Sequence, residues 1–334
     1  MFSTTNAQGT TSNQVLLFRN DCSKTKILLF DFYQEKLDLK MMMSDPFCNS
    51  DMNLFSKLTI KMRWGKKRYT KGFSGKFEHV GTLGKGIMSM VPMDVKISYH
   101  HNCILVANFH NACIHVFELK SKQLKYSVST PARFPTSICI EENYNDNVNI
   151  MMDAILMFCH QNHCLYKYDL EKYLLKDNRG LAIWKSTDIA RTMSVTMRPN
   201  SKQIFCVDMD ARSVKILDSR SGITIHCISL EQSSSPFSLA FVNDFQFVLS
   251  TDINLKIFKM SVSHEWKCVK TLGKKGDNRG EFDCAQSIIF DKKSQFLIVN
   301  DRTNFRIQIV TLEGECLASF GSFSMIMIDG RSGI

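Results

Sequence analysis

The stretch FCHQNHCLYKY, residues 158–168, contains side chains that could bind a metal. Cys159 and Cys164 flank His160 and His163 within six residues, and thiolates and imidazoles are the ligands that zinc prefers in structural sites. A zinc site needs these groups aimed at one point with tetrahedral geometry. A tight turn would instead leave the two cysteines in different strands. The elements around the motif therefore decide between a metal site and an ordinary hairpin.

Similar stretches recur along the chain and predict hairpins. Each has two or three apolar residues, a small or polar residue, a short polar turn and then a strand of alternating apolar residues. The stretches are VANFHNACIHVF (106–117), FCHQNHCLYKY (158–168), CVDMDARSVKIL (206–217), LSTDINLKIF (249–258) and VNDRTNFRIQIV (299–310). The second strands begin their apolar pattern at positions 114, 166, 214, 257 and 307, which are 52, 48, 43 and 50 residues apart. This spacing is close to the roughly 40–50 residues of a propeller blade.

A second element precedes each hairpin and reads Pro-x-polar-apolar. It occurs in PMDVKI (92–97), PTSICI (135–140) and PFSLAF (236–241), and it survives without the proline in TMSVTM (192–197) and AQSIIF (285–290). Proline suits the start of a strand, where no ladder donor is needed. A further strand follows the hairpin in three repeats. Each repeat thus holds about four short strands, which predicts an all-β propeller.

In this repeat pattern the Cys-His motif occupies a hairpin turn. His160 and His163 align with the polar turn residues Asp301 and Asn304 of the last repeat, or with Asp208 and with Arg212 or its neighbour in the third. We therefore expect no metal and no cofactor, with a weak surface metal site as the alternative. The twelve cysteines are scattered singly and include no CxxC pair, which indicates free thiols rather than a zinc domain.

Residues 271–321 resemble an NHL repeat. The resemblance rests on a Gly-rich entry, Gly-x-Phe, a strand ending in Asp, an apolar-Asx hairpin, Arg-Ile-Gln and a final strand ending in Phe-Gly. The matching residues are Gly276, Gly280, Phe282, Asp291, Asp301, Arg306, Ile307, Gln308, Gly314, Phe320 and Gly321. The other repeats match this pattern less well. The resemblance implies a six-bladed propeller, so the five full repeats need one more blade.

We predict that the two ends of the chain form this sixth blade. SMIMIDGRSGI (324–334) matches the first strand of a blade, and QVLLFRNDCSKTKILLFDF (14–32) matches the hairpin that should follow. Such a composite blade would remove the open edge of the ring. We predict a flexible N-terminus over residues 1–12 and a single propeller domain over residues 13–334. A basic insertion lies near residues 33–82, and KLTIKMRWG (57–65) within it is a candidate for the last strand of the composite blade.

The formal net charge is +10, and the basic excess is concentrated in the N-terminal part. Residues 57–76, KLTIKMRWGKKRYTKGFSGK, carry eight basic residues and no acidic one, with aromatic residues between them. Cations neutralise phosphates and aromatic rings stack on bases, as single-stranded nucleic acid binding requires. The predicted nucleic-acid-binding residues are Lys57, Lys61, Arg63, Trp64, Lys66, Lys67, Arg68, Tyr69, Lys71 and Lys76. The simpler interpretation is a solvated edge strand whose lysines block edge pairing.

The hairpin turns of a propeller share one face with the loops that link its blades, and loops on a rigid scaffold are the usual place for binding. We call this the loop face. The residues predicted to lie there are His110, His160, His163, Arg212, Lys274, Lys275, Arg279 and Arg302. Acidic residues such as Asp210 and Asp277 share this face, so a uniformly basic platform is not predicted.

We expect a non-catalytic scaffold that binds a protein partner, with single-stranded RNA binding as the first alternative. NHL propellers that bind RNA support this alternative. A second alternative is a lyase or hydrolase with a metal in the central channel, as in related six-bladed propellers. Such an enzyme would need ligands on several innermost strands, where Asp94 and Asp329 are the carboxylates.

The sequence contains no apolar run of the roughly 20 residues that span a membrane. Its first residues also lack the basic and apolar regions of a signal peptide. We therefore expect a cytoplasmic monomer that does not act at a membrane.

Overall fold

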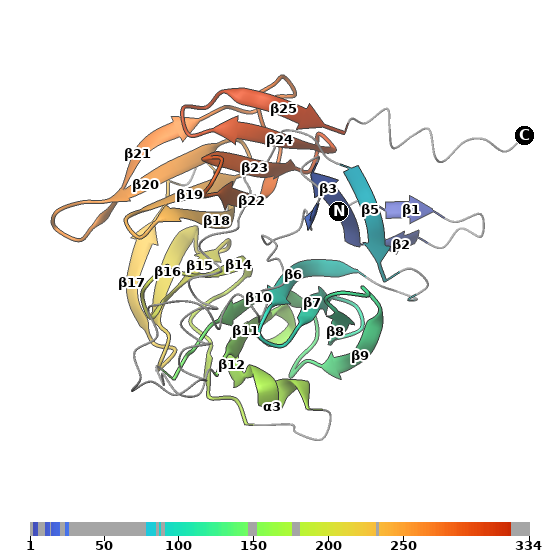
Figure 1. Ribbon diagram of the computed structural model, residues 1–334. Coiled ribbons are helices and arrows are strands. Elements are labelled where there is room, and N and C mark those ends of the chain that lie inside the picture. The colour runs from blue at the N-terminus through green and yellow to red at the C-terminus, as the bar shows by residue number, and fades with distance from the viewer. Residues whose placement is uncertain are drawn as a thin grey trace, which may run out of the picture.

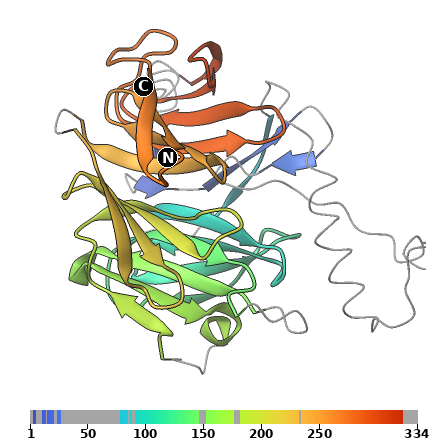
Figure 2. The same ribbon diagram turned by 90° about the vertical axis from the view of Figure 1, so that its left-hand side faces the viewer.

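The computed structural model describes residues 78–84, 87, 91–145, 152–175, 181–231 and 234–321, together with four short strands within residues 3–26. Five four-stranded antiparallel sheets lie as blades around a common centre (Figure 1). Seen from the rim, the yellow strands of the third blade lie between the green second blade and the orange fourth blade (Figure 2). The chain is therefore an all-β propeller with about four strands per repeat, as predicted.

The blades follow one another along the chain. The first contains β6 (Pro92–Ser98), β7 (Cys103–Asn108), β8 (Cys113–Glu118) and β9 (Leu124–Ser129). The second contains β10 (Pro135–Glu141), β11 (Ala154–Cys159), β12 (Cys164–Asp169) and β13 (Trp184–Ser186). The third contains β14 (Thr192–Met197), β15 (Gln203–Asp208), β16 (Ser213–Asp218) and β17 (Thr224–Ser229). The fourth contains β18 (Pro236–Asn243), β19 (Gln246–Thr251), β20 (Leu255–Met260) and β21 (Trp266–Leu272). The fifth contains β22 (Ala285–Asp291), β23 (Phe296–Asp301), β24 (Arg306–Thr311) and β25 (Cys316–Phe320).

A smaller sheet occupies the gap between the first and fifth blades in Figure 1. It contains β3 (Val15–Asn20), β4 (Lys24–Lys26) and β5 (Glu78–Leu83), in the order β4-β3-β5. The hairpin predicted within residues 14–32 is present as β3 and β4, and β5 pairs with β3. Outside this sheet, β1 (Ser3–Thr5) pairs with β2 (Thr11–Asn13). The candidate strands at 57–65 and 324–334 lie outside the described residues.

Apolar side chains fill the spaces between neighbouring blades. Every residue of β7 is buried: Ile104 and Val106 pack in a cluster with Leu83 of β5, whereas Leu105 packs in a cluster with the second blade. The alternation of side chains along a strand explains how one strand contributes to two such layers. In β23 of the fifth blade the pattern differs, since Ile298 stays half-exposed on the side that faces away from the fourth blade.

The innermost strands are β6, β10, β14, β18 and β22, and consecutive members of this set contact each other. The polar residue of the Pro-x-polar-apolar pattern joins these strands, because its side-chain oxygen accepts a hydrogen bond from a backbone N–H of the next blade. The acceptor and donor pairs are Asp94 and Ile138 at 2.9 Å, Ser137 and Val195 at 3.0 Å, Ser194 and Leu239 at 3.3 Å, and Ser238 and Ile288 at 3.4 Å. The pattern in the sequence is therefore a device that joins the blades near the centre.

A buried ion pair within the second blade contacts the third blade through Ser219 and Lys202. Glu141 at the end of β10 lies 2.7 Å from Lys167 of β12, and their side chains are 4% and 2% exposed. Lys167 also donates to the carbonyl oxygen and the hydroxyl of Ser219, at 2.8 and 2.9 Å, while Lys202 lies 3.2 Å from Glu141. Burial lowers the pKa of Lys167, and the hydrogen bond that Lys167 donates to Glu141 partly opposes this shift.

A short helix, α3 (Leu170–Leu174), follows β12. Asp169 caps its first turn by accepting a hydrogen bond from the backbone N–H of Lys172 at 2.9 Å. No helix in the described part of the chain is long and apolar enough to cross a membrane.

Candidate functional site

The hairpin turn after the second strand of a blade lies beside the loop that enters the same blade. Asn108, at the end of β7, accepts a hydrogen bond from the backbone N–H of Val91 at 2.9 Å. Asp208 occupies the same position in the third blade and accepts a hydrogen bond from the backbone N–H of Ala190 at 3.0 Å. Asp301 does so in the fifth blade and accepts from the backbone N–H of Asp283 at 2.8 Å. Hairpin turns and entry loops therefore share one face, as predicted for the loop face.

The second blade departs from this arrangement, and here the predicted alignment is wrong by one residue. Cys159 lies opposite Pro135, as Asp301 lies opposite Ala285, so Cys159 and not His160 corresponds to Asp301. Cys159 offers no carboxylate to the entry loop. Instead, the side-chain oxygen of Gln161 in the turn accepts a hydrogen bond from the backbone N–H of Arg133 in the entry loop, at 2.8 Å.

The alignment of the second histidine with Asn304 is also wrong, whereas its alignment with Arg212 of the third blade is confirmed. His163 is the last residue of a four-residue turn and has a left-handed backbone, with φ of 49°. It therefore corresponds to Phe305, whose φ is 52°, rather than to Asn304. The sequence alignment matched polar turn residues with one another and therefore missed this register. The pairing of the strands determines it.

The two cysteines of the motif face each other across β11 and β12 and are buried. Burial raises the pKa of the Cys159 thiol to about 12 and also raises that of Cys164. The rings of His160 and His163 lie 5.1 Å apart, and Nδ1 of His163 contacts the carbonyl oxygen of Ala190. Among the described residues, these four side chains do not form a group that could hold a metal. Their geometry is that of a hairpin with packed thiols.

The hairpin turns of four blades end on a residue with a left-handed backbone. These residues are Ala112, His163, Arg212 and Phe305, with φ of 48°, 49°, 46° and 52°. On the opposite face, the turns between first and second strands contain left-handed residues at Asn102, Asn143, Asn200 and Gln295, with φ of 49°, 51°, 49° and 60°. Asparagine and glycine tolerate this conformation best, and bulky side chains tolerate it poorly. Three of these four turns between first and second strands use asparagine, whereas the hairpin turns of the loop face use Ala, His, Arg and Phe. The turns between third and fourth strands, on the opposite face, hold Lys122 and His264 in the left-handed conformation, with φ of 63° and 61°.

The structure places all eight predicted residues in hairpin turns or entry loops, but in separate groups. His160 and His163 lie together on the second blade, and Lys274, Lys275, Arg279 and Arg302 belong to the turn and entry loop of the fifth. Some of these cations have partners within the fold. Lys274 lies 3.3 Å from Glu281, and Arg279 donates to the carbonyl oxygens of Cys316 and Leu317 at 3.0 and 2.9 Å.

Further residues of the loop face escaped the sequence analysis. Phe109 stacks on Phe134 of the next entry loop at 4.7 Å between ring centroids, and His110 contacts the edge of Phe109 at 5.6 Å. Arg191 pairs with Asp210 at 2.8 Å. The sequence did contain a signal for Phe109 and Phe134, because both phenylalanines stand in turn sequences of otherwise polar or small residues.

The charged pair Arg191 and Asp210 lies close enough to influence His160. Burial lowers the pKa of His160, and His163 and Arg191 lower it further, whereas Asp210 raises it.

The ten predicted nucleic-acid-binding residues within 57–76 lie outside the described residues.

A cluster on the opposite face was also missed. His100 and His101 lie in the turn between β6 and β7. In the structure they lie beside Asp153, which comes from the second blade.

No family model matches the chain, and no curated protein matches it. Two solved structures are similar to it. The crystal structure of a functionally unknown protein from Desulfotomaculum acetoxidans DSM 771 has a TM-score of 0.53 and 14% identity, over 73% of this chain and 74% of that one. Chaetomium thermophilum Raptor has a TM-score of 0.53 and 17% identity, over 70% of this chain and 21% of Raptor. At these identities the likeness concerns the fold alone.

Proposed function

We propose that this propeller is a non-catalytic, monomeric cytoplasmic platform that binds a protein partner on its loop face. The contrast between the two sets of turns carries the proposal. The turns after the second strands hold His163, Arg212 and Phe305 in a left-handed backbone, where three of the turns between first and second strands use asparagine. Bulky residues held in this strained conformation are a reason to suspect function at these turns.

The composition of the loop face suits a protein partner. Phe109 and Phe134 offer aromatic surface, and Arg191 and Asp210 offer charges of both signs. Aromatic residues and arginine are enriched where proteins bind each other. A mixed face of this kind favours a polar and aromatic protein surface over a polyanion.

The polar groups of the innermost strands support a role without catalysis. Of the two carboxylates that a channel metal could use, Asp94 lies within the described residues and Asp329 outside them. Oδ2 of Asp94 accepts from Ile138, and its Oδ1 lies 2.6 Å from Lys96. The serines at the equivalent position also join blades. Groups used to hold the ring together are poorly placed to bind a substrate.

Replacing His163, Arg212 or Phe305 with Asn should stabilise the fold while weakening partner binding. We expect each single change to raise the free energy of unfolding by about 0.5–1 kcal/mol, because Asn relieves the strain of the left-handed backbone. Urea unfolding measures this change. Gln295→Asn on the opposite face is the matched control and should stabilise without affecting binding. A loss of stability in all three loop-face variants would show that these side chains serve the fold.

We further propose that the ring has six NHL-like blades, closed by strands from both ends of the chain. The fifth blade supports this closure, because Ile289, Ile298 and Ile307 are only half-buried on the side away from the fourth blade. The first blade buries its comparable residues, Leu105 and Ile114, against the second blade. An apolar segment such as residues 324–334 is suited to cover the isoleucines.

Deleting residues 324–334 should therefore lower the free energy of unfolding by about 2 kcal/mol, the value of burying one or two large apolar side chains. Hydrogen exchange should then accelerate at the amides of β22 and β23. Deletion of residues 1–12 is the control and should leave both quantities unchanged. Equal behaviour of the two deletions would argue against the composite blade.

Single-stranded RNA is the second candidate ligand, favoured by the eight basic residues and the aromatic residues of 57–76. Titration with a fluorescent RNA pool across a salt series should show micromolar or tighter binding, with a slope of about −0.7 per phosphate contacted. Changing Lys66, Lys67, Arg68 and Lys71 to Glu should abolish it. A control with the same change in charge reverses the exposed Lys120, Lys125, Lys259 and Lys293. Similar binding by both variants would reject a site at 57–76.

A further inference from the structure

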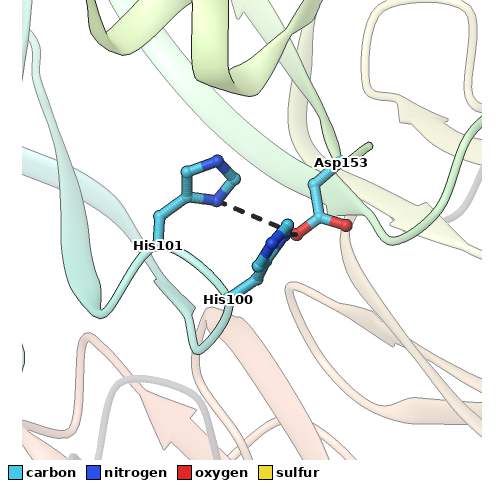
Figure 3. Close-up of side chains that lie close together, drawn as sticks. All are labelled: His100, His101 and Asp153. Carbon is cyan, nitrogen blue, oxygen red and sulfur yellow. Dashed lines mark ion pairs between the residues drawn. The ribbon is translucent and has the colours of Figure 1, made fainter. Parts of the chain in front are cut away.

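Two histidines of the first blade and one aspartate of the second meet on the face opposite to the loop face (Figure 3). His100 and His101 lie in the turn between β6 and β7, and Asp153 directly precedes β11. Nδ1 of His100 lies 3.4 Å from Oδ2 of Asp153, and Nδ1 of His101 lies 3.9 Å from the same oxygen. One ligand atom from each residue lies within 4.8 Å of the other two.

The carboxylate of Asp153 is buried, with 3% of the side chain exposed. Its Oδ1 accepts a hydrogen bond from the backbone N–H of Asn143 at 3.1 Å, which fixes its orientation. In the described part of the chain, its ion pairs are with the two imidazoles rather than with Lys or Arg. A buried carboxylate needs a positive charge close by, and an imidazole carries one only when it is protonated.

His101 lies near two further carboxylates besides that of Asp153. Burial lowers the pKa of His101, and the neighbouring His100 lowers it further, although Asp153, Glu171 and Asp169 oppose the shift. The carboxylates of Asp169 and Glu171 add negative potential that favours a cation.

We propose that His100, His101 and Asp153 form a zinc-binding site that joins the first and second blades. At a Zn–ligand distance of 2.0–2.1 Å, tetrahedral ligands lie roughly 3.3–3.5 Å apart, which the pair His100 and Asp153 already satisfies. His101 needs to approach Asp153 by about half an ångström, and the widest spacing of the group, 4.8 Å, needs to shrink by more than one ångström, which a movement of the exposed turn would allow. Imidazole with carboxylate is a usual ligand set for zinc.

Two further features concern the access of a metal to this site. The backbone N–H of His101 donates to Oγ of Ser98 at 3.2 Å, and the same oxygen lies 3.0 Å from Nδ1 of the ring, so zinc binding through Nδ1 would replace this second contact. The side chain of His100 is 42% exposed, so the fourth position of the metal faces solvent. A water molecule is the simplest fourth ligand there.

The test measures Zn²⁺ binding to the full chain by calorimetry after treatment with a chelator. Cys227 and Cys268 are exposed thiols that would also bind zinc, so all proteins carry Ser at both positions. The site variants are His100→Gln, which changes an exposed side chain, and Asp153→Asn, which keeps the acceptor for Asn143. His110→Gln is the matched control, because His110 also lies in an exposed hairpin turn but on the loop face.

We expect one Zn²⁺ per chain, bound equally by the parent and by His110→Gln and at least tenfold more weakly by both site variants. Stoichiometric Zn²⁺ should raise the thermal unfolding temperature of the parent and the control alone. Co²⁺ in place of zinc should give visible d–d bands without thiolate charge-transfer bands. Equal binding by all four proteins, a thiolate band, or no binding by the parent would overturn the proposal.

Discussion

Glu141→Ala should lower the free energy of unfolding by about 3–5 kcal/mol, the range seen when one partner of a buried ion pair is removed. Lys167 would then remain 2% exposed without its carboxylate, although Ser219 still accepts two of its hydrogen bonds. The folded-state pKa of Lys167 is already lowered from the ordinary 10.5 by burial and should fall further. Because the folded state then binds the proton less tightly than the unfolded state, the variant should regain stability as the pH rises toward about 10.

Glu231→Ala is the matched control for this experiment. Glu231 pairs with Lys256 at 2.9 Å but is 79% exposed, and exposed pairs contribute little to stability. The double variant Glu141→Leu with Lys167→Met should recover much of the loss, because it removes both charges and keeps the volume. Chemical unfolding at pH 7 measures all three. A loss for Glu141→Ala no greater than for Glu231→Ala would contradict the role given to the buried pair.

Asp208→Ala should cost about 2–4 kcal/mol, which is the second-largest effect that we expect. The carboxylate is fully buried, accepts from the backbone N–H groups of Ala190 and Ala211 at 3.0 and 3.1 Å, and lies 2.9 Å from Lys215. Without it the entry loop and the hairpin turn of the third blade lose their shared acceptor. The loop face of that blade should therefore loosen, and hydrogen exchange at Ala190 should accelerate.

The same variant should also change the acid stability of the protein. Burial raises the pKa of Asp208, but its hydrogen bonds and Lys215 outweigh burial and hold the pKa below the ordinary 3.8. A carboxyl group with a lowered folded-state pKa stabilises the fold above its unfolded pKa, and this stability is lost as the pH falls through the folded value. Below about pH 4 the wild type should lose stability more steeply than Asp208→Ala.

Asp210→Ala is the control for the Asp208 variant, since it removes an exposed carboxylate two positions away that pairs with Arg191 at 2.8 Å. Its effect on stability and on the acid slope should be small. Unfolding curves between pH 2 and pH 7 compare the three proteins. Indistinguishable curves for the two variants would show that Asp208 does not organise the turn.

The repeats made the fold predictable from the sequence, because each blade contains the same alternation and the same spacing of turns. The starting residues of the five hairpin strands lie in β8, β12, β16, β20 and β24 as expected. The Pro-x-polar-apolar pattern was visible as well, but its purpose was not. Serines such as Ser137 accept a hydrogen bond from the next blade because the innermost strands lie close together. The distance between these strands cannot be read from the sequence.

The site was less predictable, because register and long-range contacts decide it. The turn His160–Asn162 is a short 3-10 helix, so the polar residue that looked equivalent to Asp301 lies one position too late. His100, His101 and Asp153 are brought together by the packing of one blade on the next, from loops about fifty residues apart. No local pattern marks such a cluster, just as none marks the contact between Lys167 and Ser219.

The most direct test of the binding platform is quantitative capture of partner proteins by three tagged forms of the full chain. These are the wild type, a loop-face variant (His163→Asn, Arg212→Asn, Phe305→Asn) and an opposite-face variant (Asn102→Gly, Asn200→Gly, Gln295→Asn). Circular dichroism first establishes that all three are folded. We predict that the wild type and the opposite-face variant retain the same protein, and that the loop-face variant retains at least roughly tenfold less, a loss of about 1.4 kcal/mol. Equal retention by all three forms, or a loss confined to the opposite-face variant, would contradict binding through the loop face.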